Sequence, residues 1–248
     1  MSFDLGVWCA EARPSRAAAE ETYRRLCEGE TAVVPPSAAV RDFHAALIAE
    51  FPEPADGAYT ADGADAAGGA DGSDGSGGWD ESSPWSVGLD VGDGFVLMPM
   101  RWSRAAEVAP RVITLAAEHG LVCFDPQAEV VHVPPALRAA GALELRSCVG
   151  LPVSDPDPET VERAVRRLSA DNWFMILEGP AGHFVQVGTG DQAGVAAGTH
   201  ALEYRDGAPE RHYRCALPDR DQVISVFADF LRDPSTRPTG VAWESLWL

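Results

Sequence analysis

Residues 201–248 read ALEYRDGAPERHYRCALPDRDQVISVFADFLRDPSTRPTGVAWESLWL, and this stretch carries the clearest structural pattern in the chain. Two short segments, HALEYR and ERHYRCAL, flank the dipeptide Asp206-Gly207, which favours a hairpin turn. In the next segment, DQVISVFADFLR, Asp219 stands at the N-cap position and Gln222 follows three residues later. The apolar residues of that segment recur at helical spacing. The stretch therefore predicts a strand pair, an amphipathic helix and an aromatic tail.

The residues before this stretch extend the same pattern. Asp157 is placed as the N-cap of a helix that has Pro158 at its first position. Two strands, NWFMILEG and HFVQVGT, then surround a Gly-Pro-Ala-Gly turn. Together with the strand pair they predict an antiparallel four-stranded meander flanked by helices, in the order α-β-β-β-β-α. We assign this α+β domain to residues 157–248.

The first half predicts a second α/β-layered unit, a sheet with three helices over residues 1–134. Residues 2–9 alternate in polarity, with Phe3, Leu5 and Val7 on one face, as a half-buried strand does. Ser15 and Ser37 each stand as an N-cap before a helical stripe. Residues 135–156 carry weak signals and are interpreted as the connection between the halves. The fold class expected for the whole chain is α+β.

Residues 52–84 interrupt the first half with a change in composition. They are rich in Gly, Asp, Ala and Ser and contain neither Lys nor Arg. Such a segment cannot bury enough apolar surface to offset its ordering entropy. We expect a disordered acidic insertion, and the alternative is a tail that engages a basic partner.

The charge balance restricts the function. The 248 residues carry a formal net charge of −19, and all 19 basic residues are Arg. Binding to a nucleic-acid backbone depends on Lys and Arg, so the charge argues against a nucleic-acid partner and favours a basic one. The lack of Lys excludes Schiff-base chemistry and a P-loop lysine.

Cysteine spacing and hydropathy bear on the location of the protein. The five cysteines are widely spaced and form no C-x-x-C pair, which favours reduced thiols over a disulfide framework or a zinc ribbon. The sequence has neither the pattern of a signal peptide nor an apolar run of 18 residues. We therefore expect a cytoplasmic protein without a membrane partner.

The sequence offers little that predicts catalysis. It contains no G-x-S-x-G motif and no H-E-x-x-H motif, and the Gly-rich loop at 188–198 is followed by a strand, which disfavours a phosphate site. We accordingly assign no catalytic residue, no cofactor and no metal ligand. One alternative remains open: His183, His200 and His212 lie on three predicted strands and, with Glu203 or Glu210, would form a zinc site if they shared one face.

The C-terminal half also resembles a known family. The similarity lies in the strand pair LEYRDGAPERHYR and in the closing segment DQVISVFADFLRDPSTRPTGVAWESL, with its Arg-Pro pair and its V-x-W-E end. This half is similar to the α+β immunity proteins of bacterial polymorphic-toxin systems, specifically to the family numbered first among them. This resemblance covers about residues 157–248. The first half, with MSFDLGVW and AAEHGLVCFDPQ, is similar to a widespread group of uncharacterised bacterial proteins.

The resemblance implies a non-enzymatic acidic protein that neutralises a cognate toxin domain, often a basic nuclease or deaminase, by occlusion. Within the resembling stretch we nominate five partner-binding residues: Tyr204, Asp206, Glu210, Trp243 and Glu244. Two other functions remain as alternatives. One is a metal-assisted hydrolase that uses the strand histidines, and the other is a structural adaptor in a defence or secretion locus.

Overall fold

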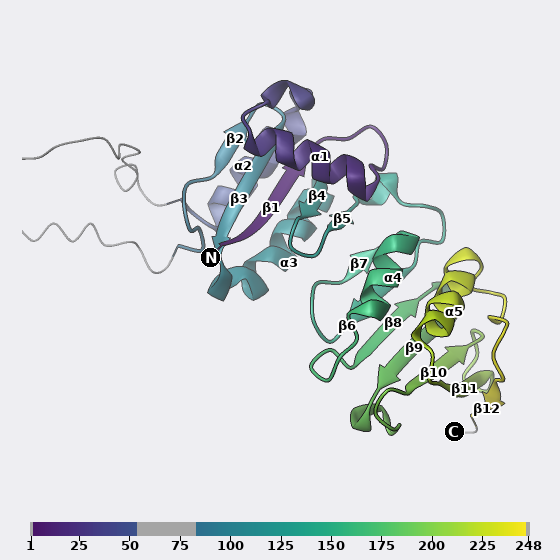
Figure 1. Ribbon diagram of the computed structural model, residues 1–248. Coiled ribbons are helices and arrows are strands. Elements are labelled where there is room, and N and C mark those ends of the chain that lie inside the picture. The colour runs from purple at the N-terminus through teal and green to yellow at the C-terminus, as the bar shows by residue number, and fades with distance from the viewer. Residues whose placement is uncertain (1, 54–82, 247–248) are drawn as a thin grey trace, which may run out of the picture. The chain divides into compact units, whose positions relative to one another are not determined.

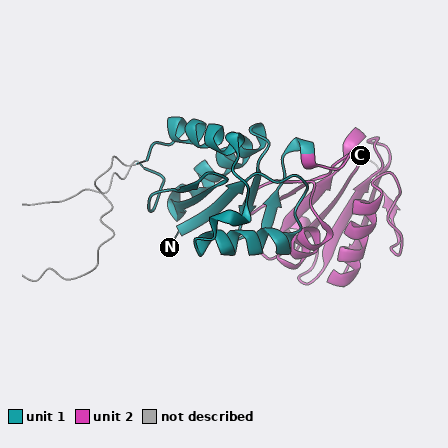
Figure 2. Cartoon of the chain, turned by 90° about the horizontal axis from the view of Figure 1, so that it is seen from above, with its two compact units in different colours: residues 1–136 teal, residues 137–248 magenta. Residues whose placement is uncertain are grey.

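The structure is a computed structural model, and it describes residues 2–53 and 83–246. The chain divides into two compact units, Met1–Ala136 and Leu137–Leu248, which we call unit 1 and unit 2 (Figure 2). Each unit combines antiparallel strands with helices, so the predicted α+β fold class is confirmed. The insertion predicted at 52–84 lies almost entirely outside the described residues.

Unit 1 is built on a five-stranded antiparallel sheet with strand order β2-β3-β1-β4-β5. The first strand is central, because it pairs with β3 along its whole length and with β4 at its C-terminal end. The strands are β1 (Ser2–Trp8), β2 (Asp90–Gly92), β3 (Phe95–Arg101), β4 (Val122–Asp125) and β5 (Val130–His132). The helices are α1 (Arg16–Cys27), α2 (Ala38–Glu50) and α3 (Trp102–Glu118).

Helices cover both faces of this sheet, with α1 on one side and α2 and α3 on the other (Figure 1). The last four residues of β1 are all buried, on both faces of the strand. Gly6 allows α1 to approach, because a Cβ at this position would lie 2.7 Å from the ring of Tyr23. The expectation that β1 is half-buried is therefore wrong for its C-terminal half. Trp8 alternates with Phe3, Leu5 and Val7 and so lies on the face that a half-buried strand would expose, yet it is 3% exposed.

Unit 2 is built on a seven-stranded antiparallel sheet with strand order β12-β11-β10-β9-β8-β6-β7. Its strands are β6 (Glu144–Ser147), β7 (Val153–Ser154), β8 (Phe174–Glu178), β9 (Phe184–Thr189), β10 (His200–Arg205), β11 (His212–Leu217) and β12 (Glu244–Ser245). Its α-helices are α4 (Pro158–Arg166) and α5 (Arg220–Arg232). The predicted four-stranded meander is present as β8–β11, each strand paired with the next.

The sheet of unit 2 is larger than the meander that the sequence predicts. Strands β6 and β7 come from residues 135–156, which we expected only to connect the halves, and β6 pairs with β8. Strand β12 adds two residues at the other edge. The three additional strands are two to four residues long, too short for alternation to identify them, so their pairing depends on the neighbouring strands.

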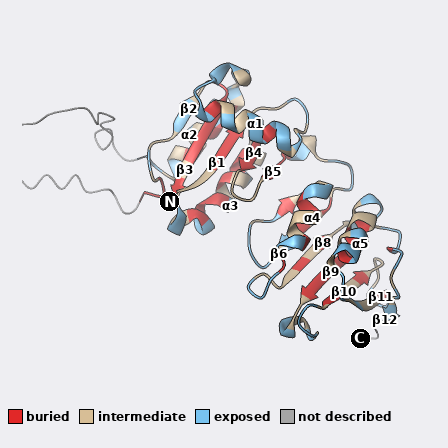
Figure 3. Cartoon of the chain, viewed as in Figure 1, coloured by how far each residue is buried: buried red, intermediate tan, exposed pale blue. Residues whose placement is uncertain are grey.

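Only one face of this sheet is covered by α-helices. Helices α4 and α5 pack against each other on the same side, and α5 contacts β9, β10 and β11 (Figure 1). Along β8 the residues alternate, with Met175 and Leu177 buried and their neighbours half-buried (Figure 3). This alternation is the pattern of a sheet with one face in the core. In the part of the chain that the structure describes, no helix is long and apolar enough to cross a membrane.

Candidate functional site

The face of the unit 2 sheet that carries neither α4 nor α5 is called the helix-free face. The strand register places its residues in three rows that each cross β8, β9, β10 and β11. The rows are Phe174, Gly188, Ala201 and Ala216; Ile176, Gln186, Glu203 and Arg214; and Glu178, Phe184, Arg205 and His212. Side chains at directly opposed positions interact across a sheet. The first of these rows is therefore apolar with mostly small residues, whereas the second and third rows carry charged residues.

Glu203 is the centre of a polar network in the middle row. Its Oε2 accepts a hydrogen bond of 2.9 Å from Nε2 of Gln186 and lies 3.1 Å from Nε2 of His212. Its Oε1 lies 4.0 Å from Nε of Arg214. The network joins β9, β10 and β11 through one carboxylate. A carboxylate held by neighbours on two strands has a fixed position, as a recognition surface requires.

In the row of Glu178, Phe184, Arg205 and His212, the side chains of Arg205 and His212 pack around the ring of Phe184. The guanidinium carbon of Arg205 lies 4.6 Å from the centre of this ring, and the His212 ring meets it edge-on at 5.5 Å. Arg205 also donates a hydrogen bond of 2.9 Å to the carbonyl of Gly182. The Arg205 guanidinium is thus held against an aromatic face, which stabilises its positive charge. Phe184 is buried although no α-helix covers it.

The apolar row ends in a small aromatic group. Trp173 precedes β8, and its ring lies 5.6 Å from that of Phe174, both half-buried. A Cβ at Gly188 would lie 2.7 Å from the Cβ of Ala193 and 3.5 Å from the Trp173 ring. The loop after β9 therefore packs onto this end of the helix-free face. Trp173 belongs to the predicted strand NWFMILEG but lies just before β8 in the structure.

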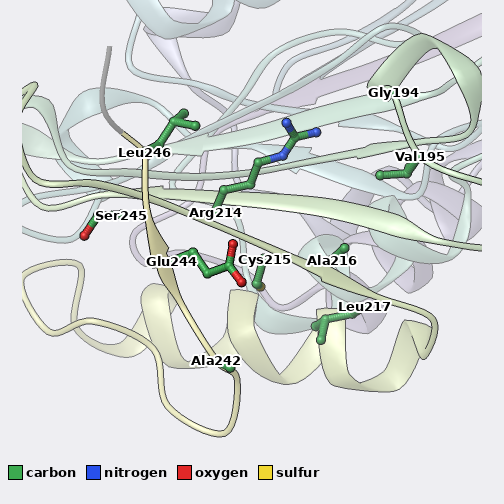
Figure 4. Close-up of a pocket in the computed structure, with 10 residues that line it drawn as sticks. All are labelled: Gly194, Val195, Arg214, Cys215, Ala216, Leu217, Ala242, Glu244, Ser245 and Leu246. Carbon is green, nitrogen blue, oxygen red and sulfur yellow. The ribbon is translucent and has the colours of Figure 1, made fainter.

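A hollow of about 550 Å³ opens at the β11 edge of the sheet (Figure 4). We call it the edge hollow, and it is lined by residues 194–195, 214–217, 242 and 244–246. The guanidinium of Arg214 points away from β12, and its Nη2 donates a hydrogen bond of 3.0 Å to the carbonyl of Ala193. The carboxyl group of Glu244 lies beside Cys215 (Figure 4). Glu244 thus places an acidic group in a partly enclosed site.

The surroundings of Cys215 change the pKa of its thiol. Burial raises the pKa of the Cys215 thiol to about 11, and the negative charge of Glu244 adds to the increase. Both effects act in the same direction, because each disfavours the thiolate. A thiol with this pKa is almost fully protonated at neutral pH and is a poor nucleophile. Cys215 therefore contributes shape to the edge hollow rather than reactivity.

Tyr204 does not belong in the predicted binding set. It is 0% exposed, and its ring packs against Phe230 of α5 at 6.2 Å and against Tyr213 at 6.2 Å. Burial and the Asp206 charge raise the pKa of its phenol to about 12. A direct contact between Tyr204 and a partner is incompatible with this position. The residue is part of the core between the sheet and α5.

Trp243 lies on the same side as Tyr204. The two rings are 5.9 Å apart, and the indole Nε1 of Trp243 donates a hydrogen bond of 2.8 Å to the carbonyl of Pro238. Arg237 lies over the ring of Tyr213, with its guanidinium carbon 4.8 Å from the ring centre. The Arg-Pro pair and the tryptophan of the closing segment therefore anchor that segment to the sheet. This is a structural role for Trp243, which is half-buried.

Asp206 and Glu210 lie at the tip of the β10–β11 hairpin. Asp206 lies between two basic side chains, with Oδ1 at 3.6 Å from Nδ1 of His183 and Oδ2 at 3.5 Å from Nη1 of Arg211. Glu210 is exposed. The five nominated residues thus occupy three places: the helix-covered face, the hairpin tip and the edge hollow. Glu244 is the member of the set that lines a concave site.

The three strand histidines do not form a common cluster. His183 and His212 lie at the hairpin end of the sheet, where Phe184 pairs with Arg205 and Arg205 pairs with His212. His200 begins β10 and lies five residues away along the strand, about 17 Å at the usual rise. The described residues contain no group of three or more His, Cys, Asp or Glu side chains arranged to hold a metal ion. The zinc arrangement that motivated the hydrolase alternative is therefore wrong in its geometry.

Sequence reasoning missed Gln186, Arg214 and Ala216, which form the helix-free face and the edge hollow. The alternation of residues along β9, β10 and β11 could have identified them, because it places these residues on the same face of the sheet as Glu203. Comparison with known proteins adds no further constraint: no family model, curated protein or solved structure matches the chain significantly.

Proposed function

We propose that the protein is a non-enzymatic acidic binding protein, immunity-like in character, which neutralises a basic toxin domain by occluding it. The observation that carries this proposal is Glu244, an exposed carboxylate in the edge hollow with no ion-pair partner in the described part of the chain. The resemblance of the C-terminal half to toxin-immunity proteins gives the class of partner. The proposed binding region belongs to unit 2.

The charge of the chain supports a basic partner. The sequence has 38 acidic residues against 19 arginines, and seven of the acidic residues lie within residues 54–82, which contain no basic residue. A strongly acidic protein attracts a basic one over distance and raises the rate of association. Such steering weakens with salt, since the Debye length falls from about 10 Å at 0.1 M to about 3 Å at 1 M.

The helix-free face supports a protein partner. It combines half-buried aromatic residues at one end with a hydrogen-bonded polar network in the middle. Protein interfaces commonly place aromatic anchors beside ordered polar groups. Occlusion needs a surface of this kind, because it depends on contact area rather than on a reactive group.

Co-expression tests the proposal directly. The chain is produced together with each toxin domain encoded beside its gene, and both growth rescue and a co-purifying complex are measured. We expect rescue and a stable complex with one such domain, and a decrease in the association rate at high salt. Failure of every neighbouring toxin domain to give either result contradicts the proposal. A complex without rescue would instead favour the structural adaptor.

A pair of charge reversals locates the binding region. Glu244→Arg places a positive charge in the edge hollow, and we expect it to weaken the complex at least tenfold. Glu11→Arg changes the net charge by the same amount at an exposed position of unit 1 and serves as the matched control. Equal weakening by both variants would show that only overall charge matters. It would thereby remove the edge hollow from the proposal.

A further inference from the structure

The outer edge of β11 is only partly occupied by a neighbouring strand. Strand β12 pairs with Tyr213 and Arg214, and the N–H of Leu246 donates a hydrogen bond of 2.8 Å to the carbonyl of His212. Antiparallel strands direct the main-chain groups of alternate residues to the same edge. The outward groups of β11 therefore belong to His212, Arg214 and Ala216. Of these, Arg214 is paired with Glu244 of β12, and the carbonyl of His212 accepts from Leu246.

Ala216 is left without a strand partner on its outer side. Continuation of the β11–β12 register would place Ala242 opposite Ala216, but the pairing ends at Glu244, and both alanines instead line the edge hollow (Figure 4). Ala216 is paired with Ala201 on its inner side, and outside the strand pairs no main-chain hydrogen bond reaches it in the described residues. An exposed strand edge with unpaired N–H and C=O groups is a template for another strand.

We propose that the edge hollow receives an extended segment of a partner protein, which adds to the sheet beside Ala216, end to end with β12. Its main chain exchanges hydrogen bonds with the N–H and C=O of Ala216, and a basic side chain of the segment pairs with Glu244. This inference deepens the proposed function, because it rests on that function for the identity of the partner. Strand addition is a common mode of peptide recognition.

The charges of the edge hollow specify a basic segment rather than an acidic one. The Arg214 guanidinium is already held by the carbonyl of Ala193 and lies near the carboxylate of Glu203. Glu244 has no such partner among the described residues, and its carboxyl lies inside the hollow beside Cys215 (Figure 4). The charge that the hollow leaves unneutralised is therefore negative. A Lys or Arg side chain neutralises it without displacing any contact of the chain.

The test uses the full chain and a defined peptide. An acetylated, amidated hexapeptide of alternating Val and Arg is titrated into the isotope-labelled protein, and amide chemical shifts are followed by NMR. The buffer contains 0.3 M salt, which screens nonspecific attraction to the acidic chain. We expect saturable shifts at residues 214–217 and 242–246. A hexapeptide of alternating Val and Glu, and an N-methylated Val-Arg hexapeptide that lacks main-chain donors, should bind at least tenfold more weakly.

Variants of the chain separate the two contacts. Ala216→Pro removes the outward N–H and should abolish the saturable shifts, whereas Ala216→Ser retains the N–H and should leave them intact. Glu244→Gln should weaken binding at least fivefold, and Glu11→Gln should not change it. Ser147→Pro alters the β6 strand near the opposite edge of the same sheet and is the matched proline control. Thermal unfolding of each variant shows that it is folded.

Several outcomes would overturn the inference. These are the absence of saturable shifts, equal binding of the Val-Glu peptide, shifts located away from the edge hollow, and a concentration-dependent dimer that Ala216→Pro dissociates. The last result would show that a second copy of the chain pairs with this edge. A toxin complex that survives Ala216→Pro contradicts strand addition and leaves the proposed function intact. Peptide binding without any toxin partner contradicts the proposed function and leaves strand addition intact.

Discussion

The two sheets of this protein differ in how helices cover them. In unit 1, α1 lies on one face of the sheet and α2 and α3 lie on the other, and four consecutive residues of β1 are buried. In unit 2, α4 and α5 lie on one face, and the residues of β8 alternate between buried and half-buried. A sheet covered on both faces has little strand surface left for recognition. This difference supports the proposal that the binding region lies in unit 2.

This difference is also visible in the polar residues of the central strands. β10 of unit 2 carries Glu203 and Arg205 on the face opposite to Leu202 and Tyr204. In β1 the positions opposite Leu5 and Val7 are Gly6, which lies against Tyr23 of α1, and Trp8, which packs beside Phe124. The charged residue of β1, Asp4, lies in the half of that strand that is not fully buried, so the difference concerns the C-terminal half of β1.

Tyr204 gives the sharpest test of which face of unit 2 is the core. Tyr204→Ala removes a fully buried ring that contacts α5, and we expect the free energy of unfolding to fall by about 3–5 kcal/mol. Hydrogen exchange of the β10 amides measures this loss for unit 2 separately from unit 1. Tyr204→Phe keeps the ring and removes a buried hydroxyl that has no hydrogen-bond partner in the structure, so it should be nearly neutral. A small effect of Tyr204→Ala would restore the residue to the binding surface.

Neighbouring residues on opposite faces test the one-sided burial of unit 2. Leu177→Ala should cost about 2–5 kcal/mol, because Leu177 is fully buried, whereas Ile176→Ala on the helix-free face should cost less than half as much. The equivalent pair in β1 should behave differently, with Val7→Ala and Trp8→Ala both costly. Urea denaturation of the four variants measures these differences. Equal costs for Leu177→Ala and Ile176→Ala would mean that both faces of the unit 2 sheet are covered.

Gly6 tests how closely α1 approaches the sheet of unit 1. Gly6→Ala places a methyl group 2.7 Å from the Tyr23 ring, and we expect a loss of about 1–3 kcal/mol from overpacking. Tyr23→Ala removes the ring, so Gly6→Ala should cost clearly less in that background. A double-mutant cycle by urea denaturation gives the coupling between the two positions. Additive effects would show that α1 does not press on β1.

The sequence predicted those helices and strands in which apolar residues recur at a regular spacing. The alternation in β8–β11 and the helical stripe of α5 come from residues spaced at 2 or 3.6, and these elements are present. Strands β7 and β12 have two residues each, and no period exists at that length. The burial of Trp8 was also missed, because alternation shows which residues share a face but not how many faces a helix covers.

The candidate site was less predictable for a related reason. Tyr204 was assigned to a binding surface although its spacing from Leu202 already placed it on the apolar side of β10. Gln186 and Arg214 lie beside Glu203 because of the register in which β9, β10 and β11 pair, and this register could not be read from the sequence. Glu244 lines the edge hollow because only Glu244 and Ser245 pair with β11, and the segment before them is held by the hydrogen bond from Trp243 to Pro238.

Helix N-caps give the smallest effect and a final contrast between the units. Asp157 accepts a hydrogen bond of 2.7 Å from the N–H of Thr160, whereas the Ser37 side chain makes no capping bond at α2. Asp157→Ala should therefore cost about 1 kcal/mol, and Ser37→Ala should cost much less. The nine-residue α4 has few turns and depends on its cap, whereas α2 is fixed by buried Phe43 and Leu47. Thermal unfolding of both variants measures the difference, and a larger loss for Ser37→Ala would show that the cap of α2 forms in solution.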